Sequence, residues 1–129
     1  MLGERLKNII EYFKNQLGDV VVTAHYSGRM KPRVYAVTVD DITVEYVTLK
    51  PSSSIYQLTL PIYITADVKK PEQSLYDALD MLDSLEQVVW QDPTLGRNCI
   101  DALLQSVEFS TVPEWERIVI RAVLKIRMT

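Results

Sequence analysis

The chain has 129 residues and a formal net charge of −3 at pH 7; 47% of its residues are hydrophobic and 24% are charged. This length suits one domain with a hydrophobic core, and the balance of apolar and charged residues excludes intrinsic disorder. A net negative charge gives no general attraction to nucleic acid or to an anionic membrane. We therefore expect a single domain, residues 1–129, with no specific binding of nucleic acid.

The sequence shows no signal for a membrane or for an oxidising compartment. No apolar run approaches the ~20 residues of a membrane-spanning helix, and the first residues lack the apolar core of a signal peptide. The single cysteine, Cys99, has no partner for an internal disulfide. We expect a protein that is made in the cytoplasm and does not contact a membrane.

The first part of the chain predicts a helix, a short strand and a basic loop. Gly18 supplies the stop for an amphipathic helix. The apolar residues of this helix recur at spacings of three and four: Leu2, Leu6, Ile9, Phe13 and Leu17. Residues 19–25 are rich in β-branched side chains and predict a strand. Residues 26–32 contain turn formers without an apolar period, which predicts an exposed loop carrying Arg29 and Lys31.

The next part predicts three strand segments. β-forming residues are nearly continuous over residues 33–50, but acidic pairs are poor in strands, so Asp40 and Asp41 predict a bend or bulge between two segments. A long strand over residues 55–67 follows a polar turn. Its apolar face consists of Tyr56, Leu58, Leu60, Ile62, Ile64 and Ala66. Pro61 has no N–H to donate to a ladder, which predicts an edge strand or a bulge.

A second helix opens at Pro71, because proline at the first helical position followed by acid in the first turn marks a helix start. Its predicted buried stripe is Leu75, Leu79, Leu82, Leu85 and Val89. Residues 92–96 repeat the start signal and predict a short helical turn. Residues 99–104 could extend that turn, but Leu103, Val107 and Phe109 favour a strand over about residues 100–109, paired as a hairpin with the final strand across a turn at residues 110–114.

The last stretch of the chain, residues 117–128, predicts a long strand with one face in the core. Its apolar face consists of Ile118, Ile120, Ala122, Leu124, Ile126 and Met128. Its cationic face consists of Arg117, Val119, Arg121, Val123, Lys125 and Arg127. Two long half-buried strands indicate an antiparallel sheet, because strands of a covered parallel sheet read as continuous hydrophobic runs. The predicted fold class is α+β, a mainly antiparallel β-sheet with two helices packed on one face.

Few residues offer catalytic or metal-binding chemistry. His25 is the only histidine, and no nucleophile elbow surrounds any serine. One cysteine and one histidine give no zinc ligand set, and an unpaired cysteine such as Cys99 is more often buried than nucleophilic. The four glycines do not cluster into a phosphate-binding loop. We therefore predict no catalytic site, no metal site and no cofactor.

Two charged stripes are candidates for partner contacts. Asp77, Asp80 and Asp83 lie three residues apart on the second predicted helix, which favours a solvated helix face or a docking surface over a site for a hard cation such as Mg²⁺. The cationic face of the final strand suits contact with an acidic partner or a solvated outer sheet face. Its valines are expected to leave partly apolar ground, which favours protein contact. This strand lacks the base-stacking aromatic residues of single-strand binders.

The chain thus contains a leading helix, a basic loop ending at Pro32, a β-rich run, a long strand, a helix from Pro71 and a closing hairpin. This order, which covers nearly the whole chain, resembles that of the tail terminator proteins of long-tailed bacteriophages and prophages, also called minor tail or tail completion proteins. Residues 92–96, Asp-Pro-Thr-Leu-Gly, followed by a strand are similar to a short phrase common in head–tail joining and tail completion proteins. These families have no catalytic motif, so no functional residue is transferred from them.

The resemblance implies a structural virion subunit and not an enzyme. Such subunits assemble into a ring, usually a hexamer, that caps the tail tube protein and docks to the head connector protein; they are found in the virion, and in the host cytoplasm during assembly. A ring with heterologous interfaces needs two different complementary patches on each subunit. The expected contact residues are Arg29, Lys31 and Arg33, then Asp77, Asp80 and Asp83, and then Arg117, Arg121, Lys125 and Arg127. The turn at residues 50–54 is a further expected contact.

Two alternatives to this function stay open at the level of the sequence. One is a small ligand-binding or catalytic α+β domain with a pocket near His25 and Tyr26. The other is a nucleic-acid-binding domain that uses the basic final strand, for which binding would fall steeply as salt rises.

Overall fold

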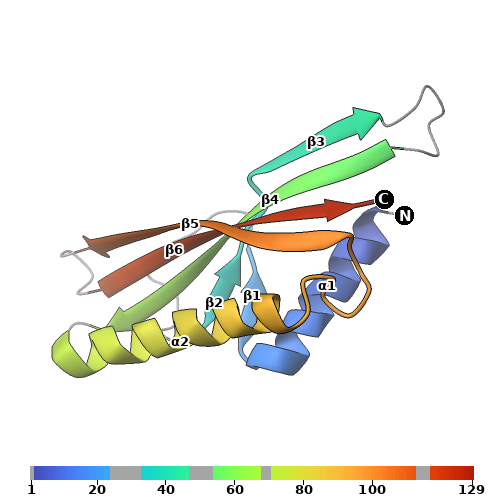
Figure 1. Cartoon of the computed structure of the whole chain (residues 1–129). Helices are drawn as coiled ribbons and strands as arrows, with labels where there is room; N and C mark the ends of the chain where they lie inside the picture. Colours follow the sequence, from blue (N-terminus) through green and yellow to red (C-terminus); the bar gives the residue numbers. More distant parts are fainter. Residues whose placement is uncertain (1, 24–32, 47–53, 68–70, 113–116) are drawn as a thin grey trace.

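The structure, a computed structural model, describes residues 2–23, 33–46, 54–67, 71–112 and 117–129. Within these residues, a six-stranded sheet carries two helices on one face, and Figure 1 shows both helices below the sheet. The elements are α1 (Leu2–Leu17), β1 (Val20–Val22), β2 (Tyr35–Val37), β3 (Asp41–Tyr46), β4 (Ser54–Asp67), α2 (Pro71–Gln91), β5 (Asp101–Val112) and β6 (Arg117–Met128). The predicted α+β class is confirmed.

The sheet is mainly antiparallel, as predicted. The strand order is β1-β2-β4-β6-β5, and β3 pairs with β4 next to β2. Only the pairing of β1 with β2 is parallel among the described strands. At the centre, β4 and β6 pair from Tyr56 opposite Met128 to Asp67 opposite Arg117. Residues directly opposite each other share a face of the sheet, so this register places the two predicted apolar faces on the same side.

The core lies between this apolar side of the sheet and the two helices. All six residues predicted for the apolar face of β6 are at most 5% exposed, and so are five of the six predicted for β4. From the helices, the core receives Ile9, Ile10, Phe13, Ala78, Leu85, Val88 and Val89. Within α2, one predicted core residue is wrong: Leu79 is 39% exposed, because it lies on the flank of the helix stripe. Neither described helix has the length and apolarity needed to cross a membrane.

A β-bulge between β2 and β3 explains the position of Pro61. Val37 pairs with Ile62 and Asp41 with Thr59, so three residues on one side (38–40) face two on the other (60 and 61). The backbone oxygen of Pro61 accepts a hydrogen bond of 2.9 Å from the N–H of Thr38. The backbone nitrogen and oxygen of Pro61 therefore point toward the bulge. The missing N–H of the proline is tolerated there, because the regular ladder of hydrogen bonds is interrupted. The predicted bulge is confirmed, whereas the edge placement of Pro61 is wrong because β4 is central.

The closing hairpin is confirmed, with β5 longer than predicted. β5 extends to Val112, so residues 110–112, predicted as part of the turn, pair with β6 instead. A second bulge lies at Gln105, because the register with β6 shifts between Leu104 and Ser106. Such a bulge inserts one residue and exchanges the faces of all residues after it.

Residues 92–96 form a hydrogen-bonded turn and not the predicted helical turn. The carboxylate of Asp92 accepts hydrogen bonds from the hydroxyl of Thr94 at 2.6 Å, from the N–H of Thr94 at 3.1 Å and from the N–H of Gly96 at 2.9 Å. The bond from the Thr94 side chain and the bond from Gly96 lower the pKa of Asp92. The turn carries Leu95, which is fully buried, into the core.

Gly96 in this turn has a positive φ of 73° and lies against α1. A Cβ on Gly96 would lie 3.0 Å from Cδ2 of Tyr12. We predict that Gly96→Ala lowers the free energy of unfolding by about 1–3 kcal/mol, from the left-handed backbone and the displaced ring. Urea denaturation measures this change. Gly3→Ala, at a helical position with open space around it, is the control and is expected to leave stability unchanged or raise it by up to about 1 kcal/mol. Equal stabilities of the two variants would contradict this account of the turn.

Candidate interaction surfaces

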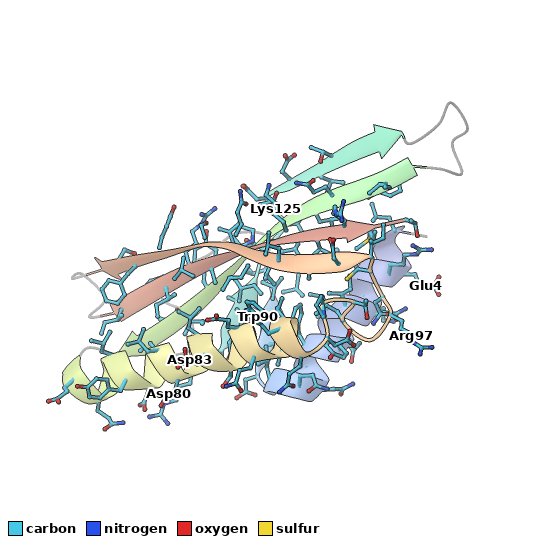
Figure 2. The ribbon with its side chains drawn as sticks, in the orientation of Figure 1. Glu4, Asp80, Asp83, Trp90, Arg97 and Lys125 are labelled. Atoms are coloured by element: carbon cyan, nitrogen blue, oxygen red, sulfur yellow. The ribbon has the colours of Figure 1, made fainter. Side chains whose placement is uncertain are left out.

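The described cations of β6 lie on the sheet face away from the helices and bind neighbouring strands. Figure 2 shows Lys125 on this side. Its Nζ donates a hydrogen bond of 2.7 Å to the hydroxyl of Thr59 on β4. Arg121 donates from Nε to the hydroxyl of Tyr63 at 3.2 Å and lies 3.7 Å from Glu108 of β5. The cations therefore connect β6 to the strands on both sides of it.

The third cation of this face, Arg127, forms the closest ion pair with β5. Its Nε donates a hydrogen bond of 2.9 Å to Oδ1 of Asp101, and a second nitrogen contacts Oδ2. This two-point contact lowers the pKa of Asp101. The hydrogen bond to Tyr63 likewise raises the pKa of Arg121. Part of the cationic charge predicted for partner contact is therefore balanced within the chain. The side chain of Arg117 lies outside the described residues.

The expectation of partly apolar ground between these cations is wrong. Val119 is 4% exposed and Val123 is 5% exposed. Long cationic side chains on alternate positions of the same strand cover apolar neighbours with their methylene groups. The β6 surface is therefore polar, and apolar contact with a partner must come from another part of the molecule.

The acidic residues of α2 divide into a paired group and an exposed group. Asp77 forms an ion pair of 3.0 Å with Arg33, so two residues expected to contact partners instead bind each other. Asp80 and Asp83 are exposed on α2, on the opposite side of the molecule from Lys125 (Figure 2). In the described part of the chain, no group of three His, Cys, Asp or Glu residues is placed to hold a metal ion.

Several predicted site residues lie outside the described residues. They are Arg29 and Lys31 of the basic loop, His25 and Tyr26 of the alternative pocket, and residues 50–53 of the predicted contact turn.

A cleft of about 390 Å³ lies between the end of α1, β2 and α2, and it contains Asp77, Asp80 and Tyr35 in its lining. The hydroxyl of Tyr35 donates a hydrogen bond of 2.7 Å to the backbone oxygen of Met81. Burial raises the pKa of Tyr35 to about 12, so this hydroxyl stays protonated as a donor at neutral pH. The contact fixes β2 to the middle of α2.

Cys99 is not activated as a nucleophile. Burial, followed by the charges of Asp101 and Asp92, raises the pKa of its thiol to about 11. A thiol with a raised pKa carries little of the reactive thiolate at neutral pH. Cys99 therefore contributes to packing beside the turn at residues 92–98.

The structure reveals half-exposed apolar residues at two open edges of the sheet, which the sequence reasoning missed. On β5, Val107 is 45% exposed and Phe109 is 54% exposed. On β3, Ile42 is 45% exposed and Val44 is 46% exposed. All four lie on the helix side of the sheet, because they pair with residues of its apolar face. Alternation in the sequence could indicate the exposed strands, but it gives no sign that the helices leave them uncovered.

These two edges are formed by different strands, β3 and β5, and lie on opposite sides of the sheet. Among the described strands, β5 pairs only with β6, β3 pairs only with β4, and the three-residue strand β1 pairs only with β2. Figure 1 shows β3 at the rim of the sheet that lies away from α2 and β5 at the other rim. An open edge presents unpaired N–H and C=O groups that can pair with another strand. The described strands β3 and β5 therefore form unlike open edges, each with apolar side chains on the helix side.

Comparison with known proteins leaves the site to be interpreted from its geometry. No protein-family model matches the sequence, and no curated protein matches it.

The contact between Tyr35 and Met81 gives a pH-dependent prediction. Burial in the folded chain raises the pKa of Tyr35 to about 12, from 10.0 for a tyrosine in water. A raised folded pKa means that the contribution to stability is complete below pH 10 and is lost as the pH rises toward 12. We expect Tyr35→Phe to cost about 0.5–1.5 kcal/mol at pH 7, from the lost hydrogen bond. The variant should also lose less stability than the parent chain between about pH 10 and 12. Parallel loss in both chains, measured by urea denaturation across this range, would contradict the assignment.

Proposed function

We propose that this protein is a non-enzymatic structural subunit that joins with copies of itself into a ring, as a phage tail terminator or a related head–tail joining protein does. The observation that supports the proposal is the pair of unlike open sheet edges, β3 and β5, with apolar side chains on the same face of the sheet. The order of elements along the chain, which resembles that of tail terminator proteins, supports it independently.

Unlike edges lead to a ring because each copy offers β3 to one neighbour and β5 to the other. A heterologous contact of this kind closes into a ring when a whole number of copies, each rotated by the same angle, completes one full turn. If β3 of one copy pairs with β5 of the next, the sheet continues across the contact. Ile42 and Val44 then come to lie on the same face as Val107 and Phe109. Cross-strand apolar pairs contribute roughly 0.2–1 kcal/mol each, in addition to burial of the exposed parts of these side chains.

The charged residues have a secondary role in this proposal. Exposed Asp80 on α2 and Lys125 on β6 lie on opposite sides of the molecule, so they favour one orientation of neighbouring copies through complementary charge. Arg29 and Lys31 of the basic loop are proposed to contact the tail tube or head connector protein. The ring would act in the virion and in the host cytoplasm during assembly.

Substitution of one residue at each edge tests the contact. We expect Phe109→Asp or Ile42→Asp to abolish assembly, because a charge at a buried contact costs several kcal/mol, or roughly a hundredfold or more in affinity. Each variant alone should stay monomeric by native mass spectrometry and analytical ultracentrifugation. Val22→Asp is the matched control, since Val22 is 59% exposed on β1 and takes no part in the proposed contact.

Mixing the two edge variants separates a heterologous contact from a symmetric one. The Ile42→Asp chain keeps an intact β5 and the Phe109→Asp chain keeps an intact β3, so an equal mixture should form a heterodimer and no larger species. Dimers formed by the Ile42→Asp chain alone would indicate a symmetric β5 contact and contradict the ring. A parent chain that is monomeric at all salt concentrations, with and without tail tube protein, would also count against it.

A further inference from the structure

A pocket lies where the end of α2 meets the start of β5, away from Val107 and Phe109. It has a volume of about 340 Å³. It is lined mainly by apolar residues, with one carboxylate: Glu86, Val89, Trp90, Pro93, Ala102, Leu103 and Leu104. Trp90, at the rim of this pocket on the helix side of the sheet, is 76% exposed. A largely exposed indole ring beside an apolar hollow favours contact with a partner.

A second hollow of about 330 Å³ adjoins the pocket on the α2 side and is lined by Asp83, Glu86, Gln87 and Trp90. Trp90 and Glu86 line both hollows, and so they form the boundary between an apolar site and an acidic one. The labelled side chains of Asp83 and Trp90 both belong to α2 (Figure 2). The arrangement offers an indole ring and two carboxylates beside an aliphatic pocket.

The charge around this site is one-sided. α2 contains five acidic residues and no lysine, arginine or histidine. Asp77 is paired with Arg33, but Asp83 and Glu86 form no ion pair with any residue in the described ranges. The local potential is therefore negative, and it repels an acidic segment and attracts a basic one.

We propose that this pocket binds a cationic segment of a partner protein. An aliphatic side chain of the segment fills the pocket against Val89 and Leu104, and neighbouring Lys or Arg side chains lie on the Trp90 ring and reach Asp83 and Glu86. A cation over an indole ring is favourable, and an apolar anchor with a charged rim is the usual anatomy of a peptide contact. The inference does not rest on ring formation.

A second copy of this chain is a poorer occupant than a different protein. On β6 of a second copy, Arg121 and Arg127 already bind Glu108 and Asp101 of their own chain, and Lys125 donates a hydrogen bond to Thr59. Breaking these pairs would offset the gain from new ones. A free basic segment of another protein carries no such cost.

The test uses three synthetic peptides with the Trp115→Phe chain, in which Trp90 is the remaining tryptophan. The basic peptide is Gly-Ser-Arg-Leu-Arg-Leu-Arg-Ser-Gly; one comparison peptide has Glu in place of Arg, and the other has Ser in place of Leu. We expect the basic peptide to give a saturable change in Trp90 fluorescence and to bind at least about tenfold more tightly than either comparison peptide. Equal binding of the Arg and Glu peptides, or no change in fluorescence, would overturn the proposal.

Substitutions in the chain test the location of the site. Glu86→Lys should weaken binding of the basic peptide about tenfold or more, whereas Glu11→Lys, the same change of charge on the exposed face of α1, should alter it less than about twofold. Equal effects of the two substitutions would assign the binding to net charge and overturn the proposal. A third result would also overturn the proposal. If the parent chain does not bind the peptide and Glu86→Lys abolishes self-assembly, the occupant of the pocket is a second copy of this chain.

Peptide binding is distinguishable from ring formation in the same set of variants. Phe109→Asp removes the proposed ring contact but leaves the pocket intact, so it should bind the basic peptide as the parent chain does. Loss of peptide binding in Phe109→Asp, with the chain still folded by circular dichroism, would contradict an independent pocket at this end of β5.

Discussion

The rest of the structure depends on the pairing of β4 with β6. These two strands form one continuous antiparallel ladder, and every residue predicted for the apolar face of β6 lies opposite one of β4 on the same side. That surface is wide enough to hold α2 across the middle, and α2 packs mainly against β4 and β6. Because one helix covers the centre, the outer strands β5 and β3 keep their apolar side chains partly exposed. The exposure of apolar side chains at these two edges is thus a consequence of how the helices cover the core.

The long strands and the helices could be predicted because their patterns are local. Alternation over twelve residues in β6 and the spacing of three and four in α1 each depend on side chains within the same element. The pattern of β5 was harder to interpret. Leu103, Val107 and Phe109 are all odd-numbered and suggest one face, but the bulge at Gln105 places Leu103 with Lys125 on the outer face and the other two on the helix side.

The candidate site depends on contacts between distant parts of the chain, which sequence patterns do not contain. The pairing of Arg33 with Asp77, and of Arg121 with Glu108, follows from the register of the sheet and the position of α2. Without that register, the charged stripes look free for a partner. Prediction from the sequence identified the stripes correctly as surface features. It overestimated their free charge and placed apolar ground at Val119 and Val123, which the structure buries.

The charged sides, the β3 and β5 edges and the acidic pocket of this chain have separate roles in the proposed assembly. The central claim is that unlike edges of one sheet join copies of this chain into a closed ring. Electron microscopy of the purified protein, at a concentration where the parent chain is fully assembled, tests this claim most directly. We expect uniform rings with a central hole. Open filaments would contradict closure of the ring, and uniform particles of monomer size would contradict the assembly itself.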